Sequence, residues 1–422
     1  MNNLYIRDRR VSHTVVYTLC IAYALICMTK NCFSSAMVFI VEEGILTKTQ
    51  TGIITGLFYV VYGILQIVGG MVADRFDATR FVTFGLAGAG IINMIIYFNQ
   101  SYSVMLTAWS VNAVVQFAVW PSVFKILTTM PERGFRTKSI FIATFSNPIG
   151  VIMSYLVAAI VPRWQHNFLV SGIVMFAIAT IWHVVSVVGK KHLVEEDDLP
   201  EYSEEKNHSG DFNLFKTIFT SGIAFVLVVT FIRTMFDLGI KSLVPVMINE
   251  SYEEVSASFA TVLSTIVLVA GVVGIITAGN IYANKFKNEI TAVAVMFALS
   301  VPLICITLLI GKINYMLIVI CLALIVMLMS SAGYFTTTYI SIRFNKWGKG
   351  ATVSGIFNCL ASLGIVAANI VFTAMADNFG WIFTIKSWVI MGIAGTVLAC
   401  AAIPLWSKFI KKQDESSPES QE

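Results

Sequence analysis

The sequence predicts an all-α membrane protein whose twelve transmembrane helices form two pseudo-symmetric six-helix bundles. Three observations predict this fold: an apolar composition, twelve apolar runs of membrane-spanning length, and a loop motif that recurs about half a chain later. Of the 422 residues, 57% are hydrophobic and only 12% are charged, whereas a soluble domain carries about 25% charged residues. With a mean hydropathy of +0.79, this composition indicates a protein surrounded by lipid rather than water.

The apolar runs fall into two sets of six, and each run predicts one membrane span. A helix needs roughly 20 apolar residues to cross about 30 Å of hydrocarbon. The runs of the first half are 13–41, 50–73, 80–99, 103–130, 139–162 and 166–189. The runs of the second half are 217–247, 254–283, 289–310, 313–341, 350–376 and 381–408.

This count divides the chain into four segments. The first six spans predict an N-terminal bundle within 1–189, and the second six predict a C-terminal bundle within 216–410. The segment between them, 190–215, is acidic, contains a proline and has no apolar stripe, which predicts a cytoplasmic linker. The polar tail 411–422 is predicted to be disordered.

Basic residues gather in every second loop, which predicts the orientation in the membrane. The opposite loops hold only Lys48, Arg163 and Lys312. By the positive-inside rule, both termini are expected in the cytoplasm and the chain in the inner (cytoplasmic) membrane. The first apolar run is too long for a signal peptide and is expected to be a retained span. The basic residues of the predicted cytoplasmic side are Arg7, Arg9, Arg10, Arg75, Arg80, Arg133, Arg136, Lys138, Lys285, Lys287, Arg343, Lys346, Lys349, Lys408, Lys411 and Lys412.

The composition also argues against several functions. The net charge is only +4, so nucleic-acid binding is not expected. All seven cysteines fall within apolar runs and no pair has a Cys-x-x-Cys spacing, which predicts buried free thiols rather than disulfides or a metal site. No cofactor is expected. No Ser/His/Asp set or pair of carboxylates lies at membrane depth, so the chain is not expected to be an enzyme.

A loop motif occurs in both halves of the chain. After the second run, Gly70 is followed by Asp74, Arg75 and a phenylalanine. After the eighth run, Gly279 is followed by Asn284, a lysine and a phenylalanine. The two glycines lie 209 residues apart (279 − 70), close to half the chain. Internal repeats of this kind are how many secondary transporters are built, with the substrate bound between the repeats.

The first copy, Gly-x-x-x-Asp-Arg-x-x-x-x-Arg, resembles the loop 2–3 signature of the major facilitator superfamily. The resemblance implies the twelve-helix transporter fold of that family and a conformational latch that holds the outward-open state. In this latch Gly70 would allow close helix approach, Asp74 would accept hydrogen bonds from a helix N-terminus, and Arg75 and Arg80 would form ion pairs across the cytoplasmic face. Asn284 replaces the acid in the second copy, which implies a weaker latch there.

Short motifs elsewhere are similar to those of the organophosphate:phosphate antiporters, which include the glycerol-3-phosphate and hexose-phosphate transporters. The similarity to the neighbouring anion:cation symporters is looser. The motifs are Lys30-Asn31, Tyr62-Gly63, Trp120-Pro121, Glu132-Arg133-Gly134, Asn147-Pro148 and Phe379-Gly380-Trp381.

The chain departs from the antiporter pattern at some positions. A threonine precedes Lys30 where the antiporters carry arginine, and Gln66 replaces a lysine shortly before the loop glycine. Arg233 matches the arginine of the antiporters' seventh helix, although an alignment on Pro245 places Asp237 there instead. These changes leave the recognition of a phosphate ester open.

Charged side chains within the predicted spans are candidates for a binding site, because a charge at the centre of a membrane helix costs about 2.5–3.5 kcal/mol on insertion scales. Arg233, Asp237 and Lys241 are spaced four residues apart, so they share one face of the seventh predicted helix. With Lys30 of the first helix they leave an excess of two positive charges, which predicts an anionic ligand. Arginine can grip a phosphate or carboxylate with two hydrogen bonds, and lysine acts as a point charge. A purely structural ion-pair ladder is the alternative.

The repeat predicts where these groups lie in the two halves. Adding the offset of 209 residues to Lys30 gives position 239, between Asp237 and Lys241, so the first and seventh helices are expected to present their charges from equivalent, facing positions. Tyr62 and Gln66 share a face of the second helix and are expected to contact the solute. Such hydroxyl and amide groups also join helices to one another. The tenth helix carries further hydroxyl groups at Ser330, Tyr334, Thr337 and Thr338.

Together, the charges and the resemblance imply a secondary transporter of an organic anion, such as a sugar phosphate or glycerol phosphate, by alternating access in exchange for inorganic phosphate. The main alternative is a proton- or sodium-coupled symporter of a carboxylate such as a sugar acid, in which Asp237 would couple protonation to transport. An alternative of another class is a transporter-like sensor that binds an anion and signals through the linker. A monomer surrounded by membrane lipid is expected by analogy with the fold.

Overall fold

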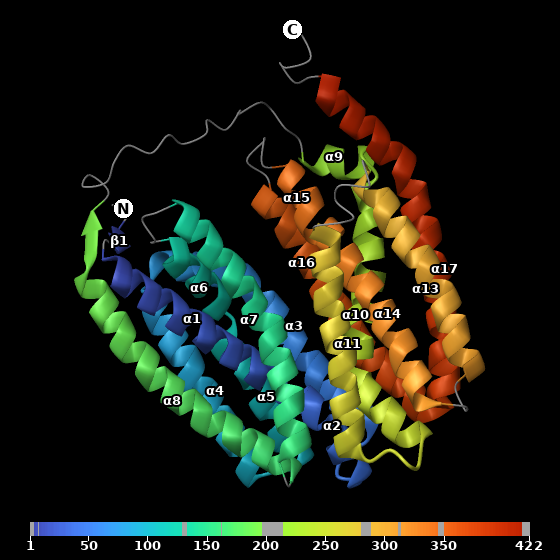
Figure 1. Cartoon of the computed structure of the whole chain (residues 1–422), viewed down its shortest axis with the longest axis horizontal. Coiled ribbons are helices and arrows are strands. Elements are labelled where there is room, and N and C mark those ends of the chain that lie inside the picture. Colours follow the sequence, from blue (N-terminus) through green and yellow to red (C-terminus); the bar gives the residue numbers. More distant parts are fainter. Residues whose placement is uncertain are drawn as a thin grey trace. The chain divides into compact units, whose positions relative to one another are not determined.

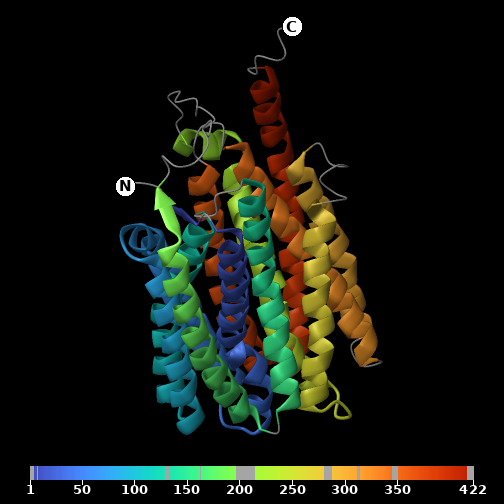
Figure 2. The same cartoon turned by 60° about the vertical axis from the view of Figure 1, so that its left-hand side comes forward.

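The computed structural model describes residues 4–6, 8–128, 133–161, 163–195, 214–279, 288–310, 314–344 and 350–415. The description covers the backbone alone at 4–6, 66–68, 70–75, 128, 133–134, 136–138, 141, 144, 193–195, 214–215, 342, 350–352, 354 and 412–415. Almost all of the described chain is helical (Figures 1 and 2). Within it, nine helical stretches are long and apolar enough to cross a membrane, and one of them, Gly355–Lys411, contains two predicted spans.

Among its described residues, the first half contains six helical segments, two of which are broken. They are α1 with α2 (Arg9–Lys30 and Cys32–Glu42), α3 (Lys48–Arg75), α4 (Ala78–Phe98), α5 with α6 (Tyr102–Gln116 and Val119–Thr128), α7 (Arg133–Ile160) and α8 (Trp164–Lys191).

The second half also contains six segments, and π-helical turns (η) interrupt two of them. They are α10 (Ile223–Ser251), α11 (Ala257–Thr277), α13 (Glu289–Ile310), α14 with η3 and α15 (Tyr315–Gly333, Tyr334–Tyr339 and Ile340–Arg343), α16 with η5 (Gly350–Ala367 and Ala368–Phe372), and α17 (Thr373–Glu415). A left-handed residue inside α17, Gly380 with φ 78°, separates the eleventh segment from the twelfth. Each predicted span coincides with a described helical segment, which confirms the predicted fold class.

Contacts divide the chain into two compact units. One comprises Met1–Glu204 with Ala257–Val262, and the other comprises Glu205–Ser256 with Leu263–Glu422. The predicted linker is described only at its ends. There β2 (Leu193–Glu195) pairs antiparallel with β1 (Leu4–Ile6), and the short helix α9 (Leu214–Thr220) begins. Helix α17 continues to Glu415, so it extends into the segment predicted as a disordered tail, and 416–422 lie outside the described residues.

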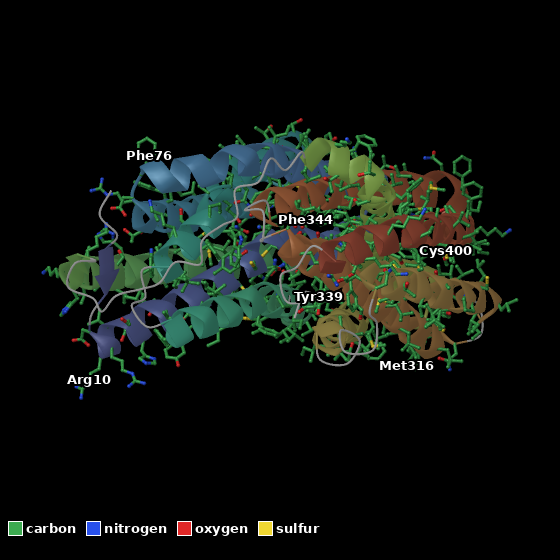
Figure 3. All side chains as sticks on the ribbon, turned by 90° about the horizontal axis from the view of Figure 1, so that it is seen from above. Arg10, Phe76, Met316, Tyr339, Phe344 and Cys400 are labelled. Carbon is green, nitrogen blue, oxygen red and sulfur yellow. The ribbon has the colours of Figure 1, made fainter. Side chains whose placement is uncertain are left out.

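Apolar side chains cover much of the outer surface of the helices, as expected for a chain in contact with lipid. Phe98 is 78% exposed and Ile390 is 70% exposed. Figure 3 shows carbon side chains along the outside of the helices, with the labelled Phe76 projecting outward. The chain is therefore a multi-pass membrane protein.

Two tryptophans join the last helix of each unit to other helices of the same unit. In the first unit the indole N–H of Trp164 donates to Glu43 at 2.9 Å, and that of Trp182 donates to the carbonyl oxygen of Thr79 at 3.1 Å. In the second unit Trp381 donates to Glu250 at 2.7 Å and Trp406 donates to Glu289 at 2.8 Å. In both units the first bond reaches the C-terminal end of the first segment, and the second reaches the N-terminal end of the third segment.

The burial of the acceptor predicts how much these indole bonds contribute to stability. Glu289 is 1% exposed, whereas Glu250 is exposed to solvent. Trp406→Phe leaves a buried carboxylate one donor short and is expected to cost about 1–3 kcal/mol of unfolding free energy. Trp381→Phe is expected to cost less, because water can replace the lost donor. Thermal unfolding of the two variants in detergent measures this difference, and a larger loss for Trp381→Phe would contradict it.

Candidate functional site

Three charged side chains lie along one face of α10 in the second unit. The carboxylate of Asp237 is 3.3 Å from the guanidinium of Arg233 and 2.6 Å from the ammonium of Lys241. Arg233 is only 7% exposed and Asp237 6% exposed. Because the three groups are spaced one helical turn apart, one carboxylate serves two cations and this cluster retains one excess positive charge.

Hydroxyl groups complete the surroundings of this cluster. Ser330 of α14 donates to Asp237 at 2.8 Å and lies 3.2 Å from the ammonium of Lys241, which donates to it. Thr234 accepts a hydrogen bond of 2.8 Å from Arg233. These bonds hold the orientation of each charged group without adding any negative charge.

The guanidinium of Arg233 keeps an unused donor. Its Nη atoms bind Asp237 and Thr234, whereas its Nε atom is buried and has no hydrogen-bond partner among the described residues. A buried charged donor without an acceptor is unfavourable. An oxygen atom of an anionic ligand would satisfy it.

Two glycines make room for the cations. A Cβ atom added at Gly333 would lie 2.4 Å from Nη1 of Arg233, and one at Gly271 would lie 2.8 Å from Nζ of Lys241. A side chain at either position would therefore displace the cation from its present place. The sequence analysis did not identify these positions, because glycine is common in membrane helices and its spacing does not reveal which glycine faces a charge.

The π-helical turns η3 and η5 lie beside the same cluster. Turn η3 follows directly after Gly333. Turn η5 contains Asn369, which accepts a hydrogen bond of 3.3 Å from Ser242, the residue after Lys241. Single π-helical turns inside α-helices occur frequently at functional sites.

Lys30 lies in the first unit at a break between α1 and α2. Asn31 separates the two helices, and its side chain donates to the carbonyl oxygen of Cys27 at 2.8 Å. The ammonium of Lys30 lies 4.1 Å from the centre of the Tyr62 ring, a distance that permits a cation–π interaction. Among the described side chains, no carboxylate pairs with Lys30. The predicted site residues Lys30 and Tyr62 therefore lie together.

A buried polar network supports the start of α2 in this unit. Cys32 lies 2.9 Å from the hydroxyl of Ser171, and Ser35 lies 2.9 Å from that of Ser154. Asn167 donates to Ser35 at 3.1 Å. These bonds join α2 to α7 and α8, and the sequence analysis did not identify them because each residue is an ordinary small polar residue in an apolar run.

The prediction that all seven cysteines are buried is wrong for three of them. Cys20, Cys27, Cys32 and Cys321 are buried, whereas Cys359 and Cys400 are exposed and Cys305 is intermediate. An apolar run predicts a membrane helix but does not show which face of the helix meets lipid, and an exposed cysteine on a lipid-facing side needs no polar partner.

The predicted latch is described only in part. The side chains of Gln66, Gly70, Asp74 and Arg75 lie outside the described residues. Arg80 is described, and its side chain is 76% exposed and lies 3.4 Å from Asp77.

Asp77 is an acid of this loop to which the sequence analysis gave no role. It caps α4 by accepting the backbone N–H of Thr79 at 3.0 Å, and it also pairs with Lys190 at the end of α8. Partial burial raises the pKa of Asp77, but the hydrogen bonds from Lys190 and Thr79 outweigh it and lower the pKa below its ordinary value.

The twelve-segment fold and the buried charges define a membrane protein with the architecture of a secondary transporter. The sequence pattern described as Major Facilitator Superfamily matches residues 19–369. The chain belongs to this superfamily.

Curated relatives indicate which members of the superfamily this chain resembles. "Membrane sensor protein UhpC" of Salmonella typhimurium is 28% identical over 170 residues, which is 40% of this chain and 38% of that protein. "Probable hexose phosphate transport protein" of Chlamydia trachomatis serovar D is 28% identical over 123 residues, which is 28% of this chain and 27% of that protein. The matched stretch is less than half the length of either relative. At this modest identity, the relatives confirm the resemblance to the organophosphate:phosphate antiporter subgroup.

A solved structure supports the fold over nearly the whole chain. It is a bacterial homologue of the human lysosomal transporter Spinster in an inward-facing and occupied conformation. It has a TM-score of 0.77 at 14% identity, and the match covers 95% of this chain and 98% of that chain. At this identity the likeness concerns the fold alone.

The geometry of α10 predicts the effect of removing its carboxylate. Asp237→Asn leaves the buried Arg233 and the partly buried Lys241 without their counter-charge, and breaking a buried ion pair in this way costs about 3–5 kcal/mol. Ser330→Ala removes only hydrogen bonds and is expected to cost about 1 kcal/mol. Thermal unfolding in detergent compares the two variants. Equal losses would contradict the role of Asp237 as the counter-charge.

The lowered pKa of Asp77 predicts a pH-dependent contribution to stability. Above the usual carboxyl pKa of about 3.9 the contribution is fully present, and it is lost as the pH falls through the lower pKa of the folded chain. Asp77→Asn can still cap α4 but has no charge for Lys190, so it is expected to unfold at a lower temperature than the native chain at pH 7. The difference should narrow below about pH 4. A difference that is the same at all pH values would contradict this role of the charge.

Proposed function

We propose that the chain is a secondary transporter of an organic anion, such as a sugar phosphate or glycerol phosphate, and exchanges it for inorganic phosphate. The observation that carries the proposal is a set of cations that outnumber the carboxylates paired with them. Arg233 has an unused Nε donor, Lys241 shares its carboxylate with Arg233, and no described carboxylate pairs with Lys30. A phosphate group offers several acceptor oxygens and the negative charge that this set lacks.

Each group has a separate role in the proposed site. Arg233 binds the anion through directed hydrogen bonds, whereas Lys30 and Lys241 attract it as point charges. Asp237 and Ser330 hold Lys241 in place. Tyr62 and Gln66 contact the polar part of the solute.

The proposed cycle alternates access to the site from the two sides of the membrane. Lys30 belongs to one bundle and the α10 cations to the other. Closing the empty site would therefore bring like charges together, which is unfavourable. A bound anion screens this repulsion and permits closure, which favours exchange over one-way transport. The loop residues Gly70, Asp74, Arg75 and Arg80 act as the conformational latch.

The location and assembly follow from the same proposal. The excess of basic residues in alternate loops supports a multi-pass protein of the inner membrane with both termini in the cytoplasm. Each six-helix unit has its own core of buried apolar residues, and a monomer is proposed as the working form by analogy with the fold. The first bundle is proposed to comprise 1–189 and the second 216–410, joined by the linker 190–215.

Anion sensing is a second candidate function, because one curated relative is named as a membrane sensor protein. A sensor would bind the anion at the same cations without carrying it across the membrane. Coupled uptake of a carboxylate with protons or sodium is a further alternative and would make Asp237 the group that titrates during the cycle.

Phosphate exchange in proteoliposomes tests the proposal. Vesicles loaded with labelled inorganic phosphate are expected to release it faster when a sugar phosphate or glycerol phosphate is added outside. Lys30→Ala and Arg233→Ala are each expected to slow this release at least tenfold, because a hydrogen bond to a charged group contributes about 1.5–3 kcal/mol. Lys386→Ala is the matched control, since Lys386 is an exposed lysine of α17.

The results of this experiment distinguish exchange from sensing and from symport. Anion binding without any exchange would replace the transporter with a sensor. Uptake of a carboxylate that depends on a proton or sodium gradient and is abolished in Asp237→Asn would replace exchange with symport. An equal loss in Lys386→Ala would contradict the proposed site.

A further inference from the structure

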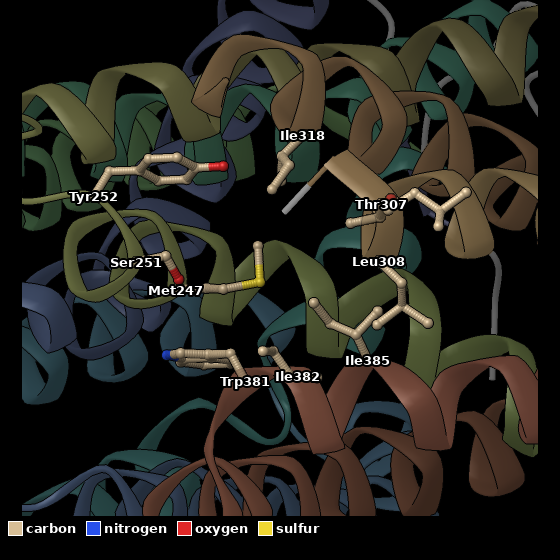
Figure 4. Close-up of a pocket in the computed structure, with 10 residues that line it drawn as sticks. Met247, Ser251, Tyr252, Thr307, Leu308, Ile318, Trp381, Ile382 and Ile385 are labelled. Atoms are coloured by element: carbon tan, nitrogen blue, oxygen red, sulfur yellow. The ribbon is translucent and has the colours of Figure 1, made fainter. Parts of the chain in front are cut away.

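A cavity lies within the second unit, at the ends of its helices and away from the charged cluster of α10. It has a volume of about 220 Å³ and lies between the end of α10, the end of α13 and the starts of α14 and the twelfth segment (Figure 4). Its walls are formed mostly by apolar side chains, including Met247, Leu308, Ile318 and Ile385. The volume is below the roughly 300 Å³ at which pockets for drug-sized molecules begin.

The rim of the cavity belongs to the apolar outer surface. Leu309 is 79% exposed and Ile382 is 56% exposed, and both line the cavity. In a chain that spans a membrane, such side chains face lipid. The cavity is therefore accessible from the bilayer.

One polar atom in the wall has no partner. Tyr252 is 7% exposed, and its hydroxyl is buried without a hydrogen bond to any described residue. Figure 4 shows this hydroxyl pointing toward the space between Ile318 and Met247. A buried hydroxyl is more stable when an acceptor is present, so an occupant that supplies an acceptor fits this position better than a pure hydrocarbon.

Aromatic residues place the cavity at the boundary between hydrocarbon and headgroups. The ring of Tyr252 lies 5.8 Å from that of Tyr315. The indole of Trp381 lines the cavity and donates to Glu250 at 2.7 Å. Tyrosine and tryptophan with an apolar body and a bonded polar tip are enriched at this depth of a membrane. The ester carbonyl groups of phospholipids lie at the same depth.

We propose that this cavity binds an acyl chain of a membrane phospholipid, whose ester carbonyl oxygen accepts a hydrogen bond from Tyr252. The aliphatic wall holds the chain, and the tyrosine hydroxyl fixes its depth. Bound there, the lipid joins α10, α13, α14 and the twelfth segment at one end of the unit. The proposal requires only that the chain spans the membrane and does not depend on the solute that it carries.

Photolabelling of the full chain tests the proposal. The chain is placed in vesicles of phosphatidylethanolamine and phosphatidylglycerol that contain a small fraction of a phospholipid with a photoreactive group in its tail. Labels are expected on Met247, Leu308 and Ile385 in at least fivefold excess over Ile390, an exposed residue of the same helix as Ile385. Ile385→Trp fills the cavity and is expected to reduce this excess at least fivefold.

Tyr252→Phe tests the hydrogen bond and keeps the shape of the wall, so it remains informative if Ile385→Trp does not fold. Binding of added phospholipid, followed by native mass spectrometry, is expected to weaken about fivefold in Tyr252→Phe, as the loss of a single hydrogen bond predicts. Tyr315→Phe, a neighbouring ring that does not line the cavity, is the control and is expected to bind as the native chain does. Equal binding by both variants, uniform labelling of Ile385 and Ile390, or labelling by a free fatty acid but not by the phospholipid would each overturn the proposal.

Discussion

The second unit depends on one constraint: two cations, the buried Arg233 and the partly buried Lys241, lie beside a single buried carboxylate. Asp237 can neutralise only one of its neighbours, although it contacts both. The surrounding helices reduce the cost in two ways. Ser330 supplies a hydrogen bond from α14, and the glycines at 271 and 333 remove side-chain volume where the cations lie. The remaining positive charge has no protein counter-charge within the cluster, so the arrangement is costly to fold and suits the anionic solute proposed above.

The two units use related connections with different chemistry. Both join their last helix to the first and third segments through tryptophan N–H groups. At the start of the third segment, however, the first unit uses Asp77 with Lys190, whereas the second uses the buried Glu289 with Arg343. Salt and solvent weaken the Asp77–Lys190 pair more than the Glu289–Arg343 pair, because the Glu289 carboxylate is buried. The two units thus share the positions of the tryptophan bonds but differ in the ion pairs beside them.

The sequence predicted the fold well because its strongest signals are length and hydropathy. Twelve apolar runs are enough to place twelve helices. The spacing of Arg233, Asp237 and Lys241 is enough to predict that these three residues share one face of a helix. The spacing does not reveal what the facing helix contributes. Gly271 and Gly333 are two of 28 glycines, and nothing in their neighbours indicates that a cation lies against them. The same limit explains why the role of Asp77 and the polar network around Asn167 became evident only from contacts between helices.

The π-helical turn η3 has a consequence for how the tenth segment is compared among relatives. An α-helix turns through about 100° per residue, and a single π-helical turn accommodates one extra residue. Every residue beyond Tyr339 is therefore rotated about the helix axis relative to the position that an uninterrupted α-helix continued from Gly333 would give it. Ser330 can face Asp237 while Arg343, on the far side of the turn, reaches Glu289. An insertion or deletion of one residue here would preserve the span but change which residues beyond it face the interior. Relatives that differ by one residue at this point can therefore share a binding site and yet differ in the ion pairs at the end of the bundle.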